Sequence, residues 1–382
     1  MNVATDKRLA ILLVVDGRYP ATGGAEIQAR LLARSLASVG HRVEILAPLL
    51  VAGMRQSEIL DGVAVTRLAY PRIRLLGALY LCGKFARWIL RRRHEFDAIH
   101  VHMAKNLAAV AGLLRPLLRA TLTVKISGAA EFTGGILDPA SQRRVLYQFY
   151  NWCIRRADCM QCVSGYTIGR LAKAGYPNNI LRLIPNAVDL SRFPVVERGR
   201  PRDGKHARVV FVGRVEPVKG LAVVLDAWAQ SGLGERARLT VAGDGTQRET
   251  LMRFARDKGI ESSVDFPGEV RNVPELLGTA DIYVQASYEE GLSNAVLEAM
   301  AAGLPIVGTR ISGNEDVVTD GDNGLLVPPG NAAALAAALR QLVENPHLAA
   351  RMGARSRARV EERFSVSAIV GKLERAYRGL PA

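Results

Sequence analysis

The sequence predicts an α/β protein built from two doubly wound parallel sheets. The chain has 382 residues, more than one hydrophobic core usually serves, so two domains are expected. Short apolar, β-prone runs alternate with helical stretches in two successive series, which is the pattern of a parallel sheet covered by helices. A polar connector that contains Pro and Gly, residues 186–206, separates the two series.

The first series fills the N-terminal half. Its opening run, LAILLVVD, is apolar and β-prone, and helical stretches lie between most of the runs that follow. Strands joined through helices lie parallel to one another, so we expect one parallel sheet. Its strands are expected at residues 9–16, 41–47, 63–70, 97–103, 121–127, 158–164 and 180–185.

The second series repeats this alternation after the connector. Open α/β sheets bind ligands at the carboxyl ends of their strands, so two such sheets joined near residue 190 are expected to face a central cleft. We therefore expect two Rossmann-like domains, residues 1–188 and 189–364. The strands of the second are expected in ARVVFVG, RLTVAGDG, SVDFPG, ADIYVQAS, LPIVGT and GLLVPP.

The composition is that of a folded cytoplasmic protein. Apolar residues make up 49% of the chain, yet no uncharged apolar run approaches the ~20 residues that span a bilayer. The N-terminal apolar segment is too short for a signal peptide. Cys159 and Cys162 have a C-x-x-C spacing, but on a strand a separation of three points the two thiols to opposite faces. We expect core cysteines and no metal or redox site.

Positive charge is concentrated in the first half. The net charge is +15, and residues 1–190 contain 26 Lys and Arg against 12 Asp and Glu. Residues 72–93 combine arginines with leucines and aromatic residues and contain no acid, which resembles an interfacial helix on an anionic membrane surface. The alternative is an amphipathic helix with its apolar side on the sheet and its arginines in water. Nucleic acid is a weaker candidate partner, because no recognisable binding module accompanies the charge.

Two carboxylates, Glu290 and Glu298, flank a Gly-Leu-Ser-Asn turn that follows the apolar run 280–287. Ser293 or Asn294 is expected to cap a helix, which leaves Glu290 on the loop and Glu298 on the first helical turns. Both can then face one crevice at the end of a buried strand, where helix N–H groups also attract anions. The alternative is a helix with one capping acid and one solvated acid.

Two further loops have features of phosphate sites. Gly23 and Gly24 come directly before a helix, and such a turn lets backbone N–H groups approach a phosphate. Arg214 and Lys219 follow a strand and precede a helix, so they can hold a diphosphate or simply lie on a solvated loop. The dinucleotide fingerprint G-x-G-x-x-G is missing, so we expect no nicotinamide or flavin cofactor.

Several motifs occur in the order and spacing of one family. They are GGAE near the start, PNAVDLSRF at 185–193, GRVEPVKG at 213–220, AGDG at 242–245, EGLSNAVLEAMAAGLPIV at 290–307 and NGLLVPP at 323–329. With these motifs the chain resembles a family 4 retaining glycosyltransferase of the GT-B fold, nearly end to end. The resemblance implies a metal-independent enzyme with a nucleotide sugar as co-substrate and no other cofactor. It also implies a last helix, within residues 365–382, that crosses back to the N-terminal domain.

The resemblance assigns roles to single residues. Arg214 and Lys219 are expected to bind the donor diphosphate, Glu298 the ribose hydroxyls and Glu290 the donor sugar. Gly24 is expected to contact a phosphate through its backbone. The N-terminal domain would bind the acceptor and the C-terminal domain the nucleotide sugar. The remaining expected donor contacts are the peptide groups of Gly291, Leu292, Ser293 and Asn294.

One position departs from the family pattern. Many relatives have a histidine against the donor sugar just after the fifth N-terminal strand, where this chain has Ser127. That role is absent, or it moves to Lys125 or Glu131. Otherwise His100 or His102, at the end of the preceding strand, takes it, and His102 is the better candidate because it lies nearer the strand's end. No third ligand accompanies the two histidines, so a metal is not expected.

Together these expectations describe a retaining hexosyltransferase. The donor would be a UDP- or GDP-sugar, and the acceptor a lipid-linked sugar or an envelope polysaccharide at the inner membrane face. The enzyme would be cytoplasmic and peripherally bound there. Arg214, Lys219 and helix N-termini would stabilise the leaving diphosphate. Two alternatives remain: a catalytically silent GT-B subunit that binds sugar nucleotides, and a sugar-nucleotide epimerase or phosphorylase.

Overall fold

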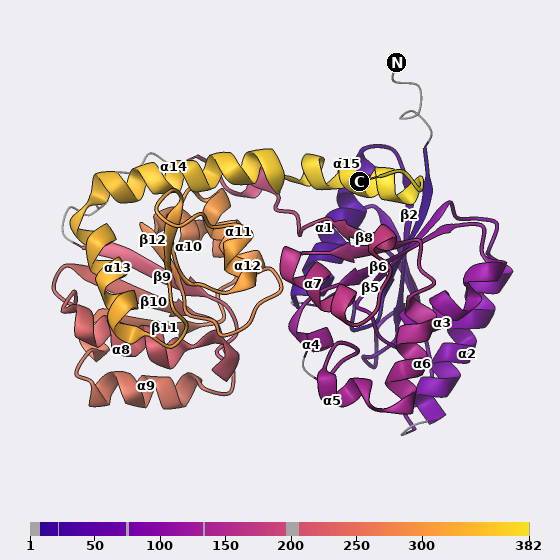
Figure 1. The fold of residues 1–382 in the computed structure, drawn as a ribbon, viewed down its shortest axis with the longest axis horizontal. Helices are drawn as coiled ribbons and strands as arrows, with labels where there is room; N and C mark the ends of the chain where they lie inside the picture. The colour runs from indigo at the N-terminus through magenta and orange to yellow at the C-terminus, as the bar shows by residue number, and fades with distance from the viewer. Residues whose placement is uncertain (1–7, 22, 74–75, 133, 196–205, 382) are drawn as a thin grey trace, which may run out of the picture. The chain divides into compact units, whose positions relative to one another are not determined.

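The computed structural model describes residues 8–21, 23–73, 76–132, 134–195 and 206–381 (Figure 1). Arg74 and Leu75 of the basic segment, and residues 196–205 of the connector, lie outside these ranges. The chain divides into two compact units. The N-terminal unit contains residues 1–187 and 366–382, and the C-terminal unit contains residues 188–365.

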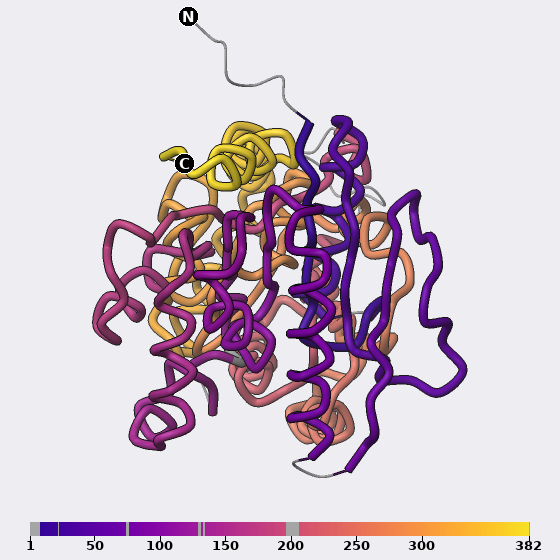
Figure 2. Tube along the Cα trace, turned by 90° about the vertical axis from the view of Figure 1, so that its right-hand side faces the viewer, coloured from indigo at the N-terminus to yellow at the C-terminus, as the bar shows by residue number. Residues whose placement is uncertain are grey.

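An eight-stranded sheet forms the centre of the N-terminal unit, in the order β3-β4-β2-β1-β5-β6-β7-β8. Neighbouring strands pair in parallel, except that β3 runs antiparallel to β4 at one edge. In Figure 2 the segment that contains β3 and β4 lies at the right-hand margin of the unit. The strands are β1 (Ala10–Val15), β2 (Arg42–Pro48), β3 (Ser57–Leu60), β4 (Val63–Leu68), β5 (Ala98–His102), β6 (Thr121–Ile126), β7 (Cys159–Cys162) and β8 (Leu181–Leu183).

Helices cover both faces of this sheet. One face lies under α1 and α15, and the other lies under α2, α3 and α6, which stand side by side in Figure 1. Cys159 belongs to the core under the first pair and Cys162 to the core under the second set, so the prediction of opposite faces is confirmed. The helices are α1 (Gly24–Ser38), α2 (Leu76–Arg91), α3 (Asn106–Leu114), α4 (Ala129–Phe132), α5 (Pro139–Gln142), α6 (Val145–Ile154), α7 (Gly165–Lys173) and α15 (Val366–Tyr377).

The C-terminal unit has a six-stranded parallel sheet in the order β11-β10-β9-β12-β13-β14. The order reverses between β9 and β12, and ligands bind open α/β sheets at such a switch point. Trp228 on α8 (Leu221–Ser231) lies in the core and donates its indole N–H to Ser263 Oγ over 3.0 Å. The strands are β9 (Ala207–Val212), β10 (Ala237–Ala242), β11 (Val264–Gly268), β12 (Ile282–Gln285), β13 (Ile306–Thr309) and β14 (Gly324–Val327).

Helices also flank the second sheet, and α14, which packs mainly on α11, lies across the top of the unit in Figure 1. Within the described ranges, none of the helices of either unit combines the length and apolar character needed to cross a bilayer. The helices of the C-terminal unit are α8 (Leu221–Ser231), α9 (Arg248–Asp257), α10 (Val273–Thr279), α11 (Asn294–Ala301), α12 (Ser312–Glu315), α13 (Ala332–Glu344) and α14 (Pro346–Arg363).

The predicted fold class is confirmed. Every run expected to be a strand forms one, and helices separate most of them. Strand β3 was not predicted, because its four residues alternate between exposed and half-buried positions and lack an apolar run. It pairs on one side only, so tertiary contact with β4 rather than local pattern defines it.

Candidate functional site

The loops after β9 and β12 meet at the switch point of the C-terminal sheet. The N–H of Tyr288 donates to the carbonyl of Val218 over 2.9 Å, which joins the two loops. Gly220 lies at this junction with a φ of 63°, and a Cβ there would stand 2.1 Å from the carbonyl oxygen of Ala286. Only glycine fits, which explains the last residue of the motif GRVEPVKG.

Lys219 and Glu290 form an ion pair across this junction. Lys219 ends a single 3-10 turn after β9, and both side chains are mostly buried, 16% and 13% exposed. The same Oε1 of Glu290 accepts hydrogen bonds from Ser287 Oγ at 3.2 Å and Gln285 Nε2 at 3.3 Å. One carboxylate oxygen therefore has three donors, which fix its position and offset its charge. Ser287 and Gln285 are absent from the predicted site residues, although both end the apolar run that precedes the glutamates.

Helix α11 begins directly after the Gly-Leu-Ser turn. Ser293 is its N-cap, and the Ser293 hydroxyl oxygen accepts the N–H of Val296 at 3.4 Å. Glu298 lies one turn further and is partly buried. Burial raises the pKa of Glu298, and the positive charge of Arg192 opposes the shift. Such a carboxyl gains strongly from hydroxyl donors that stabilise its charged form.

Arg214 lies exposed on the same loop as Lys219. The backbone of this loop packs on the AGDG segment, where a Cβ on Gly243 would lie 1.8 Å from the carbonyl oxygen of Gly213. The glycines of AGDG therefore permit backbone packing. The loop is also held by Glu216, which accepts the N–H of Thr246 at 3.2 Å and its hydroxyl at 2.6 Å. These hydrogen bonds lower the pKa of Glu216.

The N-terminal sheet has its own switch point, between β1 and β5. After β1 the chain enters α1, which starts at Gly24 with Gly23 as its N-cap. A Cβ on Gly23 would lie 2.3 Å from Oε2 of Glu26, so the carboxylate of the first helical turn occupies the space beside this glycine. An acid here stabilises the helix N-terminus, and a phosphate at Gly24 has to compete with it.

A row of buried polar side chains crosses the same sheet. His102 at the end of β5 is the register partner of Lys125 on β6, which in turn pairs with Gln161 on β7. The rings of His100 and His102 lie 4.4 Å apart, and His100 Nδ1 lies 2.7 Å from the hydroxyl of Tyr377 on α15. We call His100, His102, Lys125 and Gln161 the buried polar row.

At the centre of this row, polar side-chain atoms lack a hydrogen-bond partner among the residues that the structure describes. Among the described residues, none pairs with Nζ of Lys125 or with either ring nitrogen of His102. Burial lowers the pKa of Lys125 to about 7, and the negative charge of Glu131 opposes the shift. Burial, with the nearby charges of His100 and Lys125, also lowers the pKa of His102 well below its usual value. Near neutral pH the two histidines are therefore uncharged, and Lys125 is only about half protonated.

Two buried carboxyl groups position the loops beside the row. Glu131 accepts the N–H of Gly128 at 2.9 Å and that of Ala104 at 3.3 Å, which joins the loops after β6 and β5. Asp16, directly after β1, accepts the N–H of Leu107 at 3.0 Å. Burial raises the pKa of both carboxyls, while the backbone donors oppose the shift. Asp16 is absent from the predicted site residues. The sequence pattern could have indicated it, because an acid that directly follows an apolar strand lies at the ligand-binding edge of an open α/β sheet.

The predicted site residues therefore fall into different surroundings. Lys219 and Glu290 touch, Glu298 follows on the next helix, and Arg214 lies on the loop of Lys219. His102 has no exposed surface, so its expected contact with the donor sugar stays a prediction. In the part of the chain that the structure describes, no group of His, Cys, Asp and Glu is arranged to hold a metal ion.

Comparisons with known proteins match both units. The protein-family model described as Glycosyltransferase Family 4 matches residues 22–192, and the family model described as Glycosyl transferases group 1 matches residues 196–359. N-acetyl-alpha-D-glucosaminyl L-malate synthase of Bacillus anthracis is 26% identical over 372 residues, 94% of each chain. Lipopolysaccharide core biosynthesis glycosyltransferase LpsE of Rhizobium meliloti is 32% identical over 216 residues, 56% of this chain and 62% of the relative.

A solved structure matches the fold of the whole chain. Anabaena HepE, in a complex with UDP-glucose, superposes with a TM-score of 0.79 and 21% identity, over 97% of this chain and 100% of HepE. At this identity the likeness shows the fold alone. The fold is GT-B, as the sequence predicts.

Proposed function

This chain belongs to glycosyltransferase family 4, a family of retaining enzymes that use nucleotide sugars, and from that premise we propose a metal-independent hexosyltransferase. The N-terminal unit would bind the acceptor and the C-terminal unit the donor. The observation that supports this most is the ion pair between Lys219 and Glu290 at the switch point of the C-terminal sheet. It joins a cation, which would bind the donor diphosphate, to a carboxylate, which would accept hydroxyl hydrogen bonds from the donor sugar.

The ion pair suggests which part of the donor each of the two side chains would bind. A diphosphate would compete with Glu290 for the ammonium of Lys219, and exposed Arg214 on the same loop would add a second cation. Glu290 would then accept hydroxyl hydrogen bonds from the donor sugar, still oriented by Ser287 and Gln285. Glu298 would accept the ribose hydroxyls, which stabilise its ionised form.

The transfer itself needs the leaving group stabilised. The bond between the anomeric carbon and the diphosphate oxygen breaks, and a bond from an acceptor hydroxyl oxygen to the same carbon forms on the same face. The hydroxyl proton passes to an oxygen of the leaving phosphate. Lys219 and Arg214 would stabilise the negative charge that grows on the diphosphate. Glu290 serves as a sugar ligand in this scheme, since its contact oxygen is already held by three donors.

We propose UDP as the nucleotide of the donor. HepE, which shares the fold, was solved with UDP-glucose, and this supports UDP over GDP. For the acceptor we propose a lipid-linked sugar or an envelope polysaccharide at the inner membrane face. Similarity to the lipopolysaccharide core enzyme LpsE supports this choice, whereas the N-acetyl-alpha-D-glucosaminyl L-malate synthase, by its name, points to a small soluble acceptor.

A donor and acceptor panel tests the proposal. The protein is titrated with UDP- and GDP-sugars while thermal unfolding is followed, because a ligand that binds the folded state raises the midpoint. The stabilising donor is then incubated with lipid-linked sugars or with malate, and released nucleotide and product are measured. Release of UDP with sugar transfer to a lipid-linked acceptor is expected. Binding without turnover would instead indicate a silent subunit, and an isomerised donor without acceptor would indicate an epimerase.

A further inference from the structure

We propose that the outward face of α6, together with the first turns of α2, is the surface that docks the N-terminal unit on an anionic lipid bilayer. We call these residues the α6 surface: Leu79, Tyr80, Val145, Leu146, Phe149 and Trp152. The inference deepens the proposed membrane-side function and rests on it. It assigns the lipid contact to a helix that the charge pattern of residues 72–93 did not indicate.

Helix α6 is apolar on both sides. Its inner side buries Cys153 and Ile154 in the core of the N-terminal sheet. Its outer side leaves Val145 80% exposed and Trp152 47% exposed, with Phe149 stacked on Trp152 at 5.9 Å between ring centroids. A surface helix normally presents polar residues to water, and a contiguous exposed apolar patch marks an interaction site.

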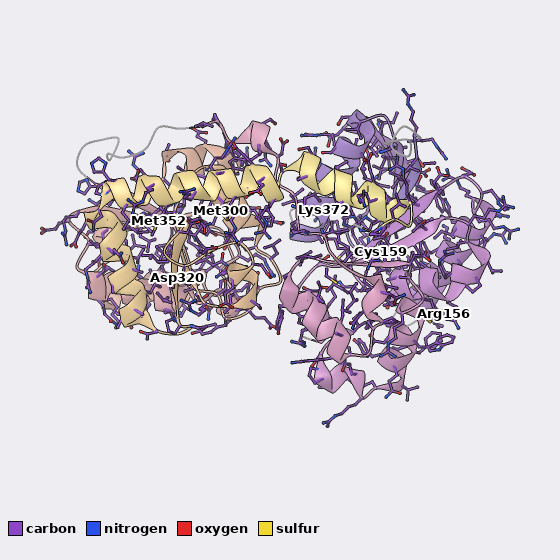
Figure 3. All side chains as sticks on the ribbon, turned by 45° about the horizontal axis from the view of Figure 1, so that its top comes forward. Arg156, Cys159, Met300, Asp320, Met352 and Lys372 are labelled. Atoms are coloured by element: carbon purple, nitrogen blue, oxygen red, sulfur yellow. The ribbon has the colours of Figure 1, made fainter. Side chains whose placement is uncertain are left out.

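Arginines surround this patch. The segment 139–157 contains no acid. Arg143 and Arg144 are exposed just before α6, and Arg156 follows it. The guanidinium of Arg156, which is exposed and labelled in Figure 3, lies 3.8 Å from the ring centroid of Trp152. Tryptophan beside arginine, next to exposed aliphatic residues, is the composition of a helix at an anionic membrane surface.

The first turns of α2 extend the same surface. Leu79 is 69% exposed and Tyr80 is also exposed. Helices α2 and α6 both pack with α3 in one layer, and each ends just before a parallel strand begins, so both start near the carboxyl edge of the sheet. The exposed apolar side chains of α2 and those of the first turn of α6 therefore lie in one helix layer and near one edge of the sheet, and Phe149 and Trp152 continue the surface along α6.

The second half of α2 has a different role. Phe85 and Ile89 are buried in the core, so there the helix packs on the sheet as the amphipathic alternative predicts. Arg92 forms ion pairs with Glu44 and Glu95 and lies 4.4 Å from the ring centroid of Trp88. Because the guanidinium of Arg92 is paired within the protein, it is not expected to contact lipid. An anionic lipid surface suits the α6 surface because the two segments that form it, residues 72–93 and 139–157, contain arginines and no acid.

Vesicle binding of the full-length protein tests the assignment. Phosphatidylglycerol vesicles are expected to sediment the wild type, and phosphatidylcholine vesicles to do so weakly. Phe149→Ser with Trp152→Ser, and separately Arg143→Glu with Arg144→Glu, should each lower the partition coefficient at least about tenfold. Ile59→Ser and Arg351→Glu change similarly exposed residues outside the α6 surface and serve as controls.

Trp152 offers a direct optical readout. It is the most exposed of the three tryptophans, since Trp228 is buried and Trp88 is half-buried. Vesicles should shift its fluorescence to the blue, and Trp152→Phe should remove that shift. Unchanged sedimentation of the double variants, or a wild type that dimerises through this face without lipid, would overturn the assignment. UDP titration separates this from the enzyme proposal, because the variants should bind nucleotide like wild type whichever way the vesicle experiment ends.

Discussion

The two switch points of this protein treat polar groups in opposite ways. In the C-terminal unit, Lys219 and Glu290 are partly buried and neutralise each other. In the N-terminal unit, His102 and Lys125 are fully buried, and no described residue pairs with the Lys125 ammonium nitrogen or with the ring nitrogens of His102. The first arrangement keeps its charges available for exchange with a ligand. The second removes charge by shifting pKa values, because an unpaired ion costs several kcal/mol in a dry core.

This difference explains why the buried polar row carries no recognisable motif of its own. The pair in the C-terminal unit needs a glycine at position 220, a cap at Ser293 and charged residues at fixed spacing, all within short segments. The buried polar row draws single residues from β5, β6 and β7 and depends on their register. Register is a tertiary property, so no local pattern reports it.

The largest effect is expected at Lys219. Lys219→Ala should slow sugar transfer about a hundredfold, close to 3 kcal/mol, because the leaving diphosphate loses a cation and Glu290 loses its partner. Arg214→Ala should produce a loss of similar size. Steady-state nucleotide release measures both. Lys258→Ala, which breaks an exposed pair with Asp226 in the same unit, should keep full activity. Full activity in Lys219→Ala would remove that residue from the site.

The two glutamates should separate in a titration with bare UDP. Glu298→Gln loses a charge-assisted acceptor for the ribose and should weaken UDP binding by ~1.5 to 3 kcal/mol. Glu290→Gln should bind UDP nearly as wild type does, yet turn over the UDP-sugar slowly. If both variants bind and turn over normally, these acids only serve the helix start.

A pH series sharpens the assignment of Glu298. The ionised carboxylate accepts ribose hydroxyls, and burial raises its pKa in the free protein. The affinity of the wild type for UDP should therefore fall as the pH is lowered through that raised pKa. In Glu298→Gln this part of the pH dependence should vanish. Calorimetric titration across mildly acidic pH measures it, and equal pH dependence in both proteins would contradict the role.

In the buried polar row, Lys125 should make the stability of the N-terminal unit depend on pH. Its pKa is about 7 in the folded protein, below its ordinary value near 10.4, so between these values the unfolded chain binds more protons. Stability should consequently rise with pH, by about 2 kcal/mol between pH 7 and pH 9. Lys125→Met should flatten this rise and stabilise the unit at pH 7. Amide exchange in β6 measures the change, and the exposed Lys173→Met is the control.

The smallest effect is expected from metal removal. Cations of the chain supply the charge stabilisation in the proposed transfer, so a chelator should leave the rate unchanged within error. Nucleotide release with and without EDTA measures this. A loss restored by added magnesium would show that Lys219 and Arg214 do not suffice.

The sequence predicts the two sheets almost completely because parallel strands buried on both faces read as continuous apolar runs. It also predicts the start of α11, since the Ser293 cap is a local device. It does not predict which part of α2 packs on the core. Buried and exposed apolar side chains within residues 72–93 have the same residue types, and only packing against the sheet distinguishes them. The apolar outer side of α6 is missed for the same reason.

Helix α15 has a consequence for how the protein is made. Ile369 and Leu373 complete the core on one face of the first sheet, and two polar contacts add to this, His41 with Glu374 at 2.5 Å and His100 with Tyr377 at 2.7 Å. On the ribosome, the strands of that sheet emerge long before this helix. The part of this face that α15 covers stays exposed until the rest of the chain has been translated. The C-terminal unit, made from one uninterrupted segment, is free to fold first, which reverses the usual order of domain folding during synthesis.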